Sequence, residues 1–134
     1  MKIYGKLIFV YIMLLMLLIT PVFGASGCMS TSTDNGPSEW AGTWDSGQWG
    51  EMKLTQNGST VTGTYTWDEG KIEGTVFGNM LRGTWSESPS YSSPDDAGDF
   101  EFTLSSDDNS FTGKWRYGSD GDWDGDWTAE KTGK

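Results

Sequence analysis

The sequence of 134 residues has no histidine and one cysteine, Cys28. Without histidine, neither a Ser–His nor a Cys–His nucleophile can form, and imidazole cannot hold a metal ion. A single cysteine cannot form a disulfide within the chain, so the folded part must be stabilised without one. The sequence therefore identifies no catalytic residue.

Basic residues are also scarce, since nine Lys and Arg stand against 19 Asp and Glu, for a net charge of −10. Lys2 and Lys6 are two of the nine, so the rest of the chain carries seven basic and 19 acidic residues, a formal charge of −12. Nucleic-acid binding needs a basic surface that contacts phosphates, which excludes nucleic acid as a partner. The same negative charge disfavours docking on anionic lipid headgroups.

The N-terminal residues 1–27 have the organisation of an export signal. Two lysines precede an apolar run from Leu7 to Ile19, and small residues follow Pro21. A charged start, a short apolar core and small residues before a cut site are typical of such signals. An ordinary signal peptidase would release a secreted protein, and an uncleaved membrane anchor is another alternative, since residues 7–24 are long enough to span a bilayer. Every alternative places the rest of the chain outside the cytoplasm.

The tetrapeptide Ala25-Ser26-Gly27-Cys28 resembles the lipobox of prokaryotic lipoproteins, except at Ala25, where that family prefers Leu. The resemblance implies a lipidated Cys28 that becomes the mature N-terminus and is attached to the membrane by several acyl chains. Stable attachment needs more than one such chain. An inert thiol is the alternative for Cys28. Residues 28–39 are rich in Ser and Thr and predict a flexible linker.

A five-residue phrase recurs six times: a large apolar residue, any residue, Gly, a small or charged residue, and a second large apolar residue. The copies are WAGTW at residues 40–44, VTGTY at 61–65, IEGTV at 72–76, LRGTW at 81–85, FTGKW at 111–115 and WDGDW at 123–127. Side chains alternate between the two faces of a strand, so the first, third and fifth positions share one face. The phrase predicts a one-sided antiparallel sheet whose glycines let it curl around its apolar face.

Eight segments are predicted to be strands. They cover residues 40–45, 50–56, 60–67, 70–77, 80–87, 98–105, 109–117 and 122–129. Turn residues separate them, and Asn57-Gly58 is a type I′ hairpin signal. This spacing predicts an all-β domain over residues 40–130, an eight-stranded antiparallel up-and-down meander closed as a small barrel.

The two faces of these strands differ sharply in polarity. The residues expected on the inner face are Trp40, Trp44, Met52, Leu54, Val61, Tyr65, Ile72, Val76, Leu81, Trp85, Phe100, Phe102, Leu104, Phe111, Trp115, Trp123 and Trp127. The opposite face carries Thr and charged residues. A membrane-spanning barrel has the reverse arrangement, so the outer face of this barrel is expected to contact water.

Gly42-Thr43-Trp44 and the segment 61–65 resemble the opening of the avidin group, and Gly-x-Trp near the first strand is similar to lipocalins. Both families are eight-stranded up-and-down barrels that bind small molecules at one end, so the resemblance implies that fold. The domain also resembles an uncharacterised type of secreted prokaryotic protein that repeats Gly-Thr-Trp and Gly-Thr-Tyr. Only Tyr65 matches the avidin group by motif, so biotin binding is not carried over.

One end of the predicted barrel has the longer loops, at residues 45–50, 67–71, 86–98 and 117–122. Ligands favour barrel mouths, and binding residues favour loops on a rigid scaffold. The candidate ligand-binding residues there are Trp44, Tyr65, Trp85, Glu87, Trp115 and Tyr117. Aromatic rings suit a sugar or a cation, since ring faces attract positive charge. Alternatively the rings only fill the core, because eight strands enclose little space.

Asp120, Asp122 and Asp124 match the first half of a helix-loop-helix calcium loop and are a candidate metal site. Such a loop needs a bidentate Glu at position twelve, where this chain has Lys131, and no helix is predicted beside it. A solvated acidic edge on the last strand is the alternative. Apart from Ca²⁺, no cofactor is predicted.

Glu87 is the one acid expected to point inward at the mouth, whereas a glycosidase needs two facing carboxylates. The sequence therefore predicts a non-enzymatic, membrane-tethered binding module for a small molecule, a carbohydrate or a component of the cell envelope. A hydrolase of envelope polysaccharide is one alternative, and a structural surface barrel without a ligand cavity is another. The sequence does not indicate an oligomeric state.

Overall fold

The computed structural model describes residues 38–134. The predicted signal or anchor at residues 1–27, the lipidation of Cys28 and most of the linker at residues 28–39 lie outside the described residues. Within the described part of the chain, no helix is both long and apolar enough to cross a membrane.

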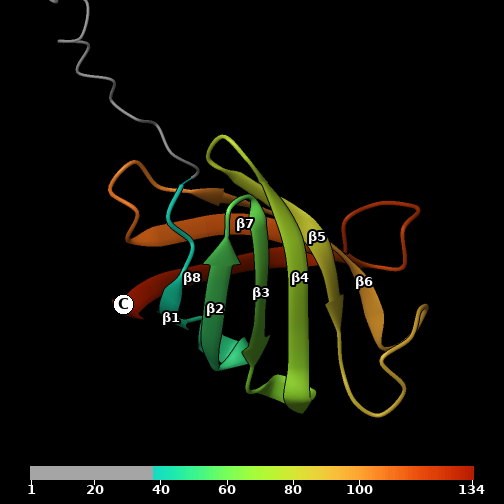
Figure 1. Ribbon diagram of the computed structural model, residues 1–134. Coiled ribbons are helices and arrows are strands. Elements are labelled where there is room, and N and C mark those ends of the chain that lie inside the picture. The colour runs from blue at the N-terminus through green and yellow to red at the C-terminus, as the bar shows by residue number, and fades with distance from the viewer. Residues whose placement is uncertain (1–37) are drawn as a thin grey trace, which may run out of the picture. The chain divides into compact units, whose positions relative to one another are not determined.

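Eight antiparallel strands close into a barrel in chain order (Figure 1). They are β1 (Gly42–Asp45), β2 (Glu51–Asn57), β3 (Thr60–Tyr65), β4 (Gly70–Phe77), β5 (Met80–Ser86), β6 (Ala97–Leu104), β7 (Ser110–Tyr117) and β8 (Gly125–Gly133). Each strand pairs with the next along the chain, and β1 also pairs with β8, which closes the wall. The structure confirms the predicted all-β, eight-stranded antiparallel barrel.

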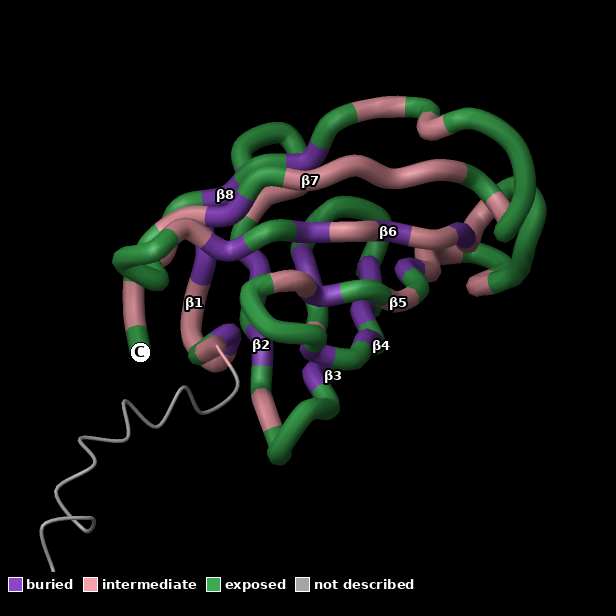
Figure 2. Tube along the Cα trace, turned by 90° about the horizontal axis from the view of Figure 1, so that it is seen from above, coloured by how far each residue is buried: buried purple, intermediate pink, exposed green. Residues whose placement is uncertain are grey.

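The core consists of apolar residues that the repeated phrase places on one face. Buried and exposed residues alternate strictly along β4, and the same alternation is visible along other strands in Figure 2. The buried apolar residues are Trp40, Trp44, Met52, Leu54, Val61, Tyr65, Ile72, Val76, Leu81, Trp85, Phe100, Phe102, Leu104, Phe111, Trp127 and Ala129. This set contains every residue predicted on the inner face except Trp115, which is partly buried, and Trp123.

Glycines in the strands allow neighbouring backbones to approach more closely than a side chain would permit. Gly83 of β5 pairs with Gly74 of β4, and a Cβ atom on Gly83 would collide with the carbonyl oxygen of Glu73. Gly70 of β4 pairs with Tyr65 of β3, whose ring occupies the space where a Gly70 side chain would lie. Bare backbone on one strand thus makes room for large side chains from the next, which lets wide rings pack inside a narrow barrel.

The predicted strand at residues 122–129 is wrong at its start, because β8 begins at Gly125. Just before that residue the chain leaves the ladder, and the amide of Asp124 donates to the carbonyl oxygen of Trp115 at 2.9 Å. The far end of β8 reaches Gly133, past the predicted domain boundary at residue 130. The two-residue alternation therefore cannot be extended backward from β8 into the preceding loop.

Trp123 consequently lies outside the barrel and not on the inner face. Its ring centroid is 4.7 Å from Nζ of Lys114 and 4.9 Å from the guanidinium carbon of Arg116, both on β7. Ring faces attract cations, and these contacts hold the indole against the outer wall.

The first hairpin also differs from its prediction. Asn57 pairs with Thr60, so the central residues of the turn are Gly58 and Ser59. Of these two, Gly58 alone has positive φ, at +61°, whereas a type I′ turn needs positive φ at both central positions. The sequence therefore predicted the hairpin correctly, but it placed the turn one residue too early, at Asn57-Gly58 instead of Gly58-Ser59.

Replacing Gly83 with Ala should destabilise the barrel, because the added methyl group collides with backbone of β4 that cannot move without opening the wall. We expect a loss of about 2 kcal/mol in the free energy of unfolding, measured by chemical denaturation. Gly133→Ala is the matched control, since its Cβ would meet only ordinary contacts with Thr43, at 3.6 Å or more. Equal stabilities for the two variants would contradict the close-approach role of Gly83.

Candidate functional site

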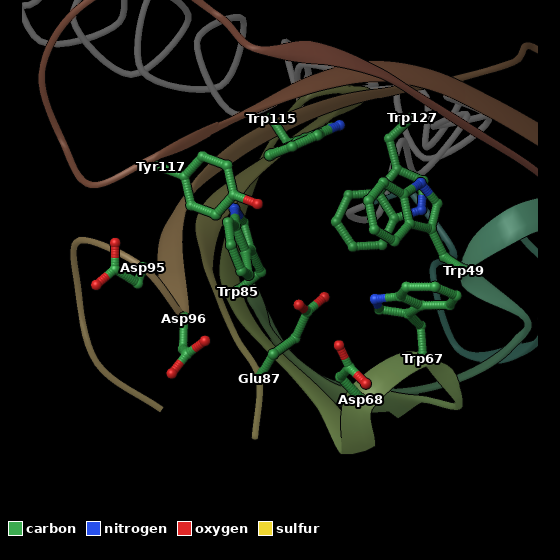
Figure 3. A pocket seen from close by; sticks show the side chains of 10 residues that line it. All are labelled: Trp49, Trp67, Asp68, Trp85, Glu87, Asp95, Asp96, Trp115, Tyr117 and Trp127. Carbon is green, nitrogen blue, oxygen red and sulfur yellow. The ribbon is translucent and has the colours of Figure 1, made fainter. Parts of the chain in front are cut away.

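A cavity of about 300 Å³, here called the mouth pocket, opens at the barrel end where β3, β5 and β7 finish (Figure 3). Two 3₁₀ turns, η2 (Gly47–Trp49) and η3 (Trp67–Glu69), form its rim together with the loop between β5 and β6. The residues that line it are Trp49, Trp67, Asp68, Trp85, Glu87, Asp95, Asp96, Trp115, Tyr117 and Trp127. The pocket therefore lies at the end that the loops and aromatic residues predicted, and it combines six rings with four carboxylates.

Four of the six predicted ligand-binding residues line the mouth pocket: Trp85, Glu87, Trp115 and Tyr117. Trp85 is buried and its Nε1 donates to the carbonyl oxygen of Arg116 at 3.1 Å, which fixes the ring across the β5–β7 side of the barrel. Trp115 is partly buried, and Tyr117 is 47% exposed on the rim. The ends of β5 and β7 therefore bring these side chains together at the mouth pocket.

Tyr65 does not line the cavity but supports a residue that does. Its hydroxyl donates to Oε1 of Glu87 at 2.7 Å, and its ring is buried. Burial and the bond to Glu87 raise the pKa of the Tyr65 phenol, so this group stays protonated and acts as a donor. Tyr65 therefore orients the carboxylate of Glu87.

Trp44 lies away from the mouth pocket. It is fully buried, its Nε1 donates to the carbonyl oxygen of Trp40 at 3.0 Å, and its ring centroid is 5.3 Å from that of Phe111. The sequence placed Trp44 at the mouth because it ends β1, but its side chain joins the packed part of the interior.

Below the pocket the barrel is filled with aromatic rings. Phe102 lies 4.3 Å from Phe100 and 4.4 Å from Phe111, measured between ring centroids, and all three are at most 1% exposed. Trp127 packs on Phe102 at 5.3 Å and also lines the pocket, which makes its ring the floor of the cavity. The interior is therefore packed in one half and hollow at the mouth.

Most neighbouring rings of the pocket are set nearly at right angles to one another (Figure 3), whereas Trp49 and Trp127 lie at 35°, with centroids 5.0 Å apart. Trp49 meets Trp67 at 88° and Trp115 at 82°, and Trp115 meets Trp85 at 85°. Edge-to-face pairs of this kind are favourable because the positive edge of one ring meets the negative face of the other. The arrangement forms an aromatic box whose faces are turned in several directions.

Sequence reasoning missed six lining residues. Trp127 was expected inside the barrel but not at the site, and Trp49, Trp67, Asp68, Asp95 and Asp96 lie in the loops and turns of the rim. Strand alternation stops where a 3₁₀ turn begins, so it gave no direction for Trp49, and the strand predicted over residues 60–67 ends at Tyr65, before Trp67. The available signal was the clustering of these loops at one barrel end.

The rim loops are fastened to each other by backbone hydrogen bonds. The amide of Ser88 donates to the carbonyl oxygen of Asp68 at 2.8 Å, and the amide of Glu87 donates to that of Asp96, also at 2.8 Å. The Ser90 hydroxyl donates to Oδ2 of Asp96 at 2.6 Å. The carboxylates of the pocket are thus carried by loops that hold a defined shape.

The four carboxylates and the burial of the mouth pocket both disfavour further negative charge there. Burial raises the pKa of Glu87 above its usual value, and the charges of Asp68 and Asp96 raise it further, against the opposing effect of the Tyr65 hydrogen bond. Burial also raises the pKa of Tyr117, as do the charges of nearby carboxylates, Glu87 foremost. Each of these shifts reports that adding negative charge at the mouth is unfavourable.

The basic residues do not neutralise this charge. The ion pairs of the described chain are Lys53–Glu51 (3.0 Å), Arg82–Glu101 (2.8 Å), Lys114–Glu101 (3.6 Å) and Arg116–Asp99 (2.9 Å). Within residues 38–134, none of these pairs involves a carboxylate of the mouth pocket. The pocket acids therefore have no ion-pair partner among the described residues, although Glu87 and Asp96 accept hydrogen bonds from Tyr65 and Ser90.

The candidate calcium residues Asp120, Asp122 and Asp124 are not gathered into a metal site. Among the residues that the structure describes, no group of three or more acidic, Cys or His side chains is arranged to hold a metal ion. Asp124 instead accepts a hydrogen bond from the amide of Tyr117 at 2.8 Å through Oδ2. Calcium binding stays a prediction of the sequence without structural support.

The stability of the wild type relative to Glu87→Gln should fall as the pH rises. Because burial raises the pKa of Glu87, the folded protein holds this proton to a higher pH than the unfolded chain does. The stabilising effect is complete below the unfolded pKa, about 4.3, and is lost as the pH rises through the folded pKa. Denaturation of both proteins between acid and neutral pH measures the difference, and a difference that grows with pH would contradict the assignment.

Comparisons of the chain with protein-family models, with curated proteins and with solved structures gave no match. The geometry and charge of the mouth pocket are therefore the grounds on which a function is assigned.

Proposed function

We propose that this protein is a non-enzymatic, extracytoplasmic binding module, tethered to the membrane by its N-terminal segment, that captures a small molecule in the mouth pocket. The observation that carries the proposal is the hollow of about 300 Å³ above a packed aromatic core. A barrel that only had to fold would be stabilised by filling this space as well, because packed rings add burial and contact energy.

The volume of the pocket and the preorganisation of its walls support this function. Ligand pockets range from about 300 to 1,000 Å³, so this cavity suits a molecule of the size of a monosaccharide or a small amine. Interlocked rim loops and edge-to-face rings hold the walls in place before any ligand arrives. Walls that are already ordered lower the entropic cost of binding.

One observation favours a hydrolase as the second candidate. Glu87 has a raised pKa, as a general acid requires, and the charge of Asp68 is close enough to contribute to that shift. Two carboxylates at one cleft are the minimum for glycoside hydrolysis. Against this, the hydrogen bond from Tyr65 stabilises the ionised form of Glu87, which opposes the role of proton donor.

Ligands of the mouth pocket should change the tryptophan fluorescence of the full-length protein, since five of its walls are indoles. We expect a saturable response to at least one member of a panel of sugars, amino acids and amines, in a polyoxyethylene detergent that carries neither sugar nor amine. Trp115→Leu should weaken that ligand about tenfold or more, because it removes a central wall. Trp123→Leu, which removes an indole outside the barrel, is the matched control and should bind normally.

A panel without any saturable response would overturn the binding function. Release of reducing ends from envelope polysaccharide, abolished by Glu87→Gln, would instead establish the hydrolase.

The tether is tested separately. Expressed in a bacterium with lipoprotein processing, the chain should incorporate labelled fatty acid and sediment with membranes, and Cys28→Ser should lose the label because the acceptor thiol is gone. Ser at residue 26 offers a control, since Ser26→Ala leaves the thiol in place. Unchanged labelling of Cys28→Ser would contradict lipidation at this residue.

A further inference from the structure

We infer that the ligand of the mouth pocket is a small alkylated ammonium cation of the tetramethylammonium or choline type. This inference rests on the proposed binding function and specifies its ligand class. It follows from three properties of the pocket: carboxylates without an ion-pair partner among the described residues, rings that no described cation covers, and walls made of rings set at steep angles to one another.

The first property is the sign of the charge. Four carboxylates line the cavity, and none of its described lining residues is Lys or Arg. Figure 3 shows the Glu87 and Asp68 carboxylates directed into the space between the rings. An anionic ligand would be repelled there, and a neutral one would leave the desolvated charge of Glu87 without a counterion. A cation is the ligand that the charge favours.

The second property is that no described cation lies over a ring of the pocket. Cations and rings meet four times in the described chain, where Lys71 lies over Tyr91, Lys114 and Arg116 over Trp123, and Lys131 over Trp44. All of these rings are outside the mouth pocket. Trp67, which is 50% exposed, thus offers a ring that no described cation covers, while Trp49 and Trp115 also contact neighbouring rings.

The third property is the shape of the box. Rings at 82° to 88° to one another surround a cation from several sides, whereas a sugar stacks on one flat ring and needs side chains that donate and accept hydrogen bonds around its edge. The described lining residues include carboxylate acceptors but no Asn, Gln, Arg or Lys, so few side chains both donate and accept around a sugar ring. Methyl groups on nitrogen need no hydrogen bonds, so an alkylated ammonium suits these walls.

Other cations fit less well. A bare metal ion requires several oxygen ligands close together, and no such group exists among the described residues. A primary ammonium has three N–H donors, which the carboxylates could accept only on their side of the pocket, while the indole faces on the other sides accept them poorly. The alkylated ammonium spreads its charge over methyl groups that contact the rings, while the carboxylates at one side supply the counter-charge.

The test compares choline with 3,3-dimethyl-1-butanol, its neutral isostere in which carbon replaces the charged nitrogen. Binding to the full-length protein in polyoxyethylene detergent is measured by calorimetry and tryptophan fluorescence at constant ionic strength. We expect choline to bind at least about tenfold more tightly than the isostere, because the two differ only in the charge that the rings and carboxylates attract. Glucose serves as the sugar control and should not bind.

Variants identify the carboxylate involved. Glu87→Gln keeps an oxygen that accepts the Tyr65 hydrogen bond and removes the charge, so choline affinity should fall about tenfold while isostere affinity stays unchanged. Glu73→Gln, an exposed residue on the outside of β4, removes one charge elsewhere and should have little effect.

The outcomes separate the two proposals. Equal binding of choline and the isostere, or preferential binding of glucose, would overturn the ammonium ligand and leave a binding module of another specificity. Failure of every compound in the wider fluorescence panel would overturn the binding function itself. The isostere comparison uses the wild-type protein, so it decides the ligand class even if Glu87→Gln does not fold.

Discussion

The close contact between bare glycine backbone and the large side chains of neighbouring strands is the constraint on which the barrel depends. Eight strands enclose a narrow space, and sixteen apolar side chains, among them four indoles, are buried by this wall. Where Gly83 meets the β4 backbone and Tyr65 covers Gly70, any side chain would force the strands apart. Because the glycines carry no side chain, large rings on the neighbouring strands fit inside the closed wall.

This packing divides the interior into two functional halves. Phenylalanines and aliphatic residues fill the end with short turns, so the fold needs no disulfide. At the other end the loops add acids and indoles around a space that the strands do not fill. Stability is supplied by the packed half, which allows the mouth to keep an uncompensated charge and a cavity, two features that a core would not tolerate.

The strands were predictable because their signal is periodic and local. Alternation assigned every expected inward residue correctly except Trp123, and it brought Trp85, Glu87, Trp115 and Tyr117 to one pocket. It failed where the chain leaves the ladder. Trp123 precedes β8 and turns outward to Lys114, while Trp49 and Asp68 sit in 3₁₀ turns whose direction depends on contacts with other loops. Such contacts are tertiary, so no short window of sequence contains them.

Trp127 belongs to both halves of the interior, since one surface of its ring packs on Phe102 and another faces the cavity. Residues that select a ligand often diverge freely because they are separate from those that maintain a fold. Here the indole of Trp127 serves both purposes, so a substitution at Trp127 that changed ligand specificity would also disturb the core. Residues in the rim loops lie outside the buried core and can change without this effect. Diversification of this barrel among relatives is therefore expected to run through its rim, with the floor held constant.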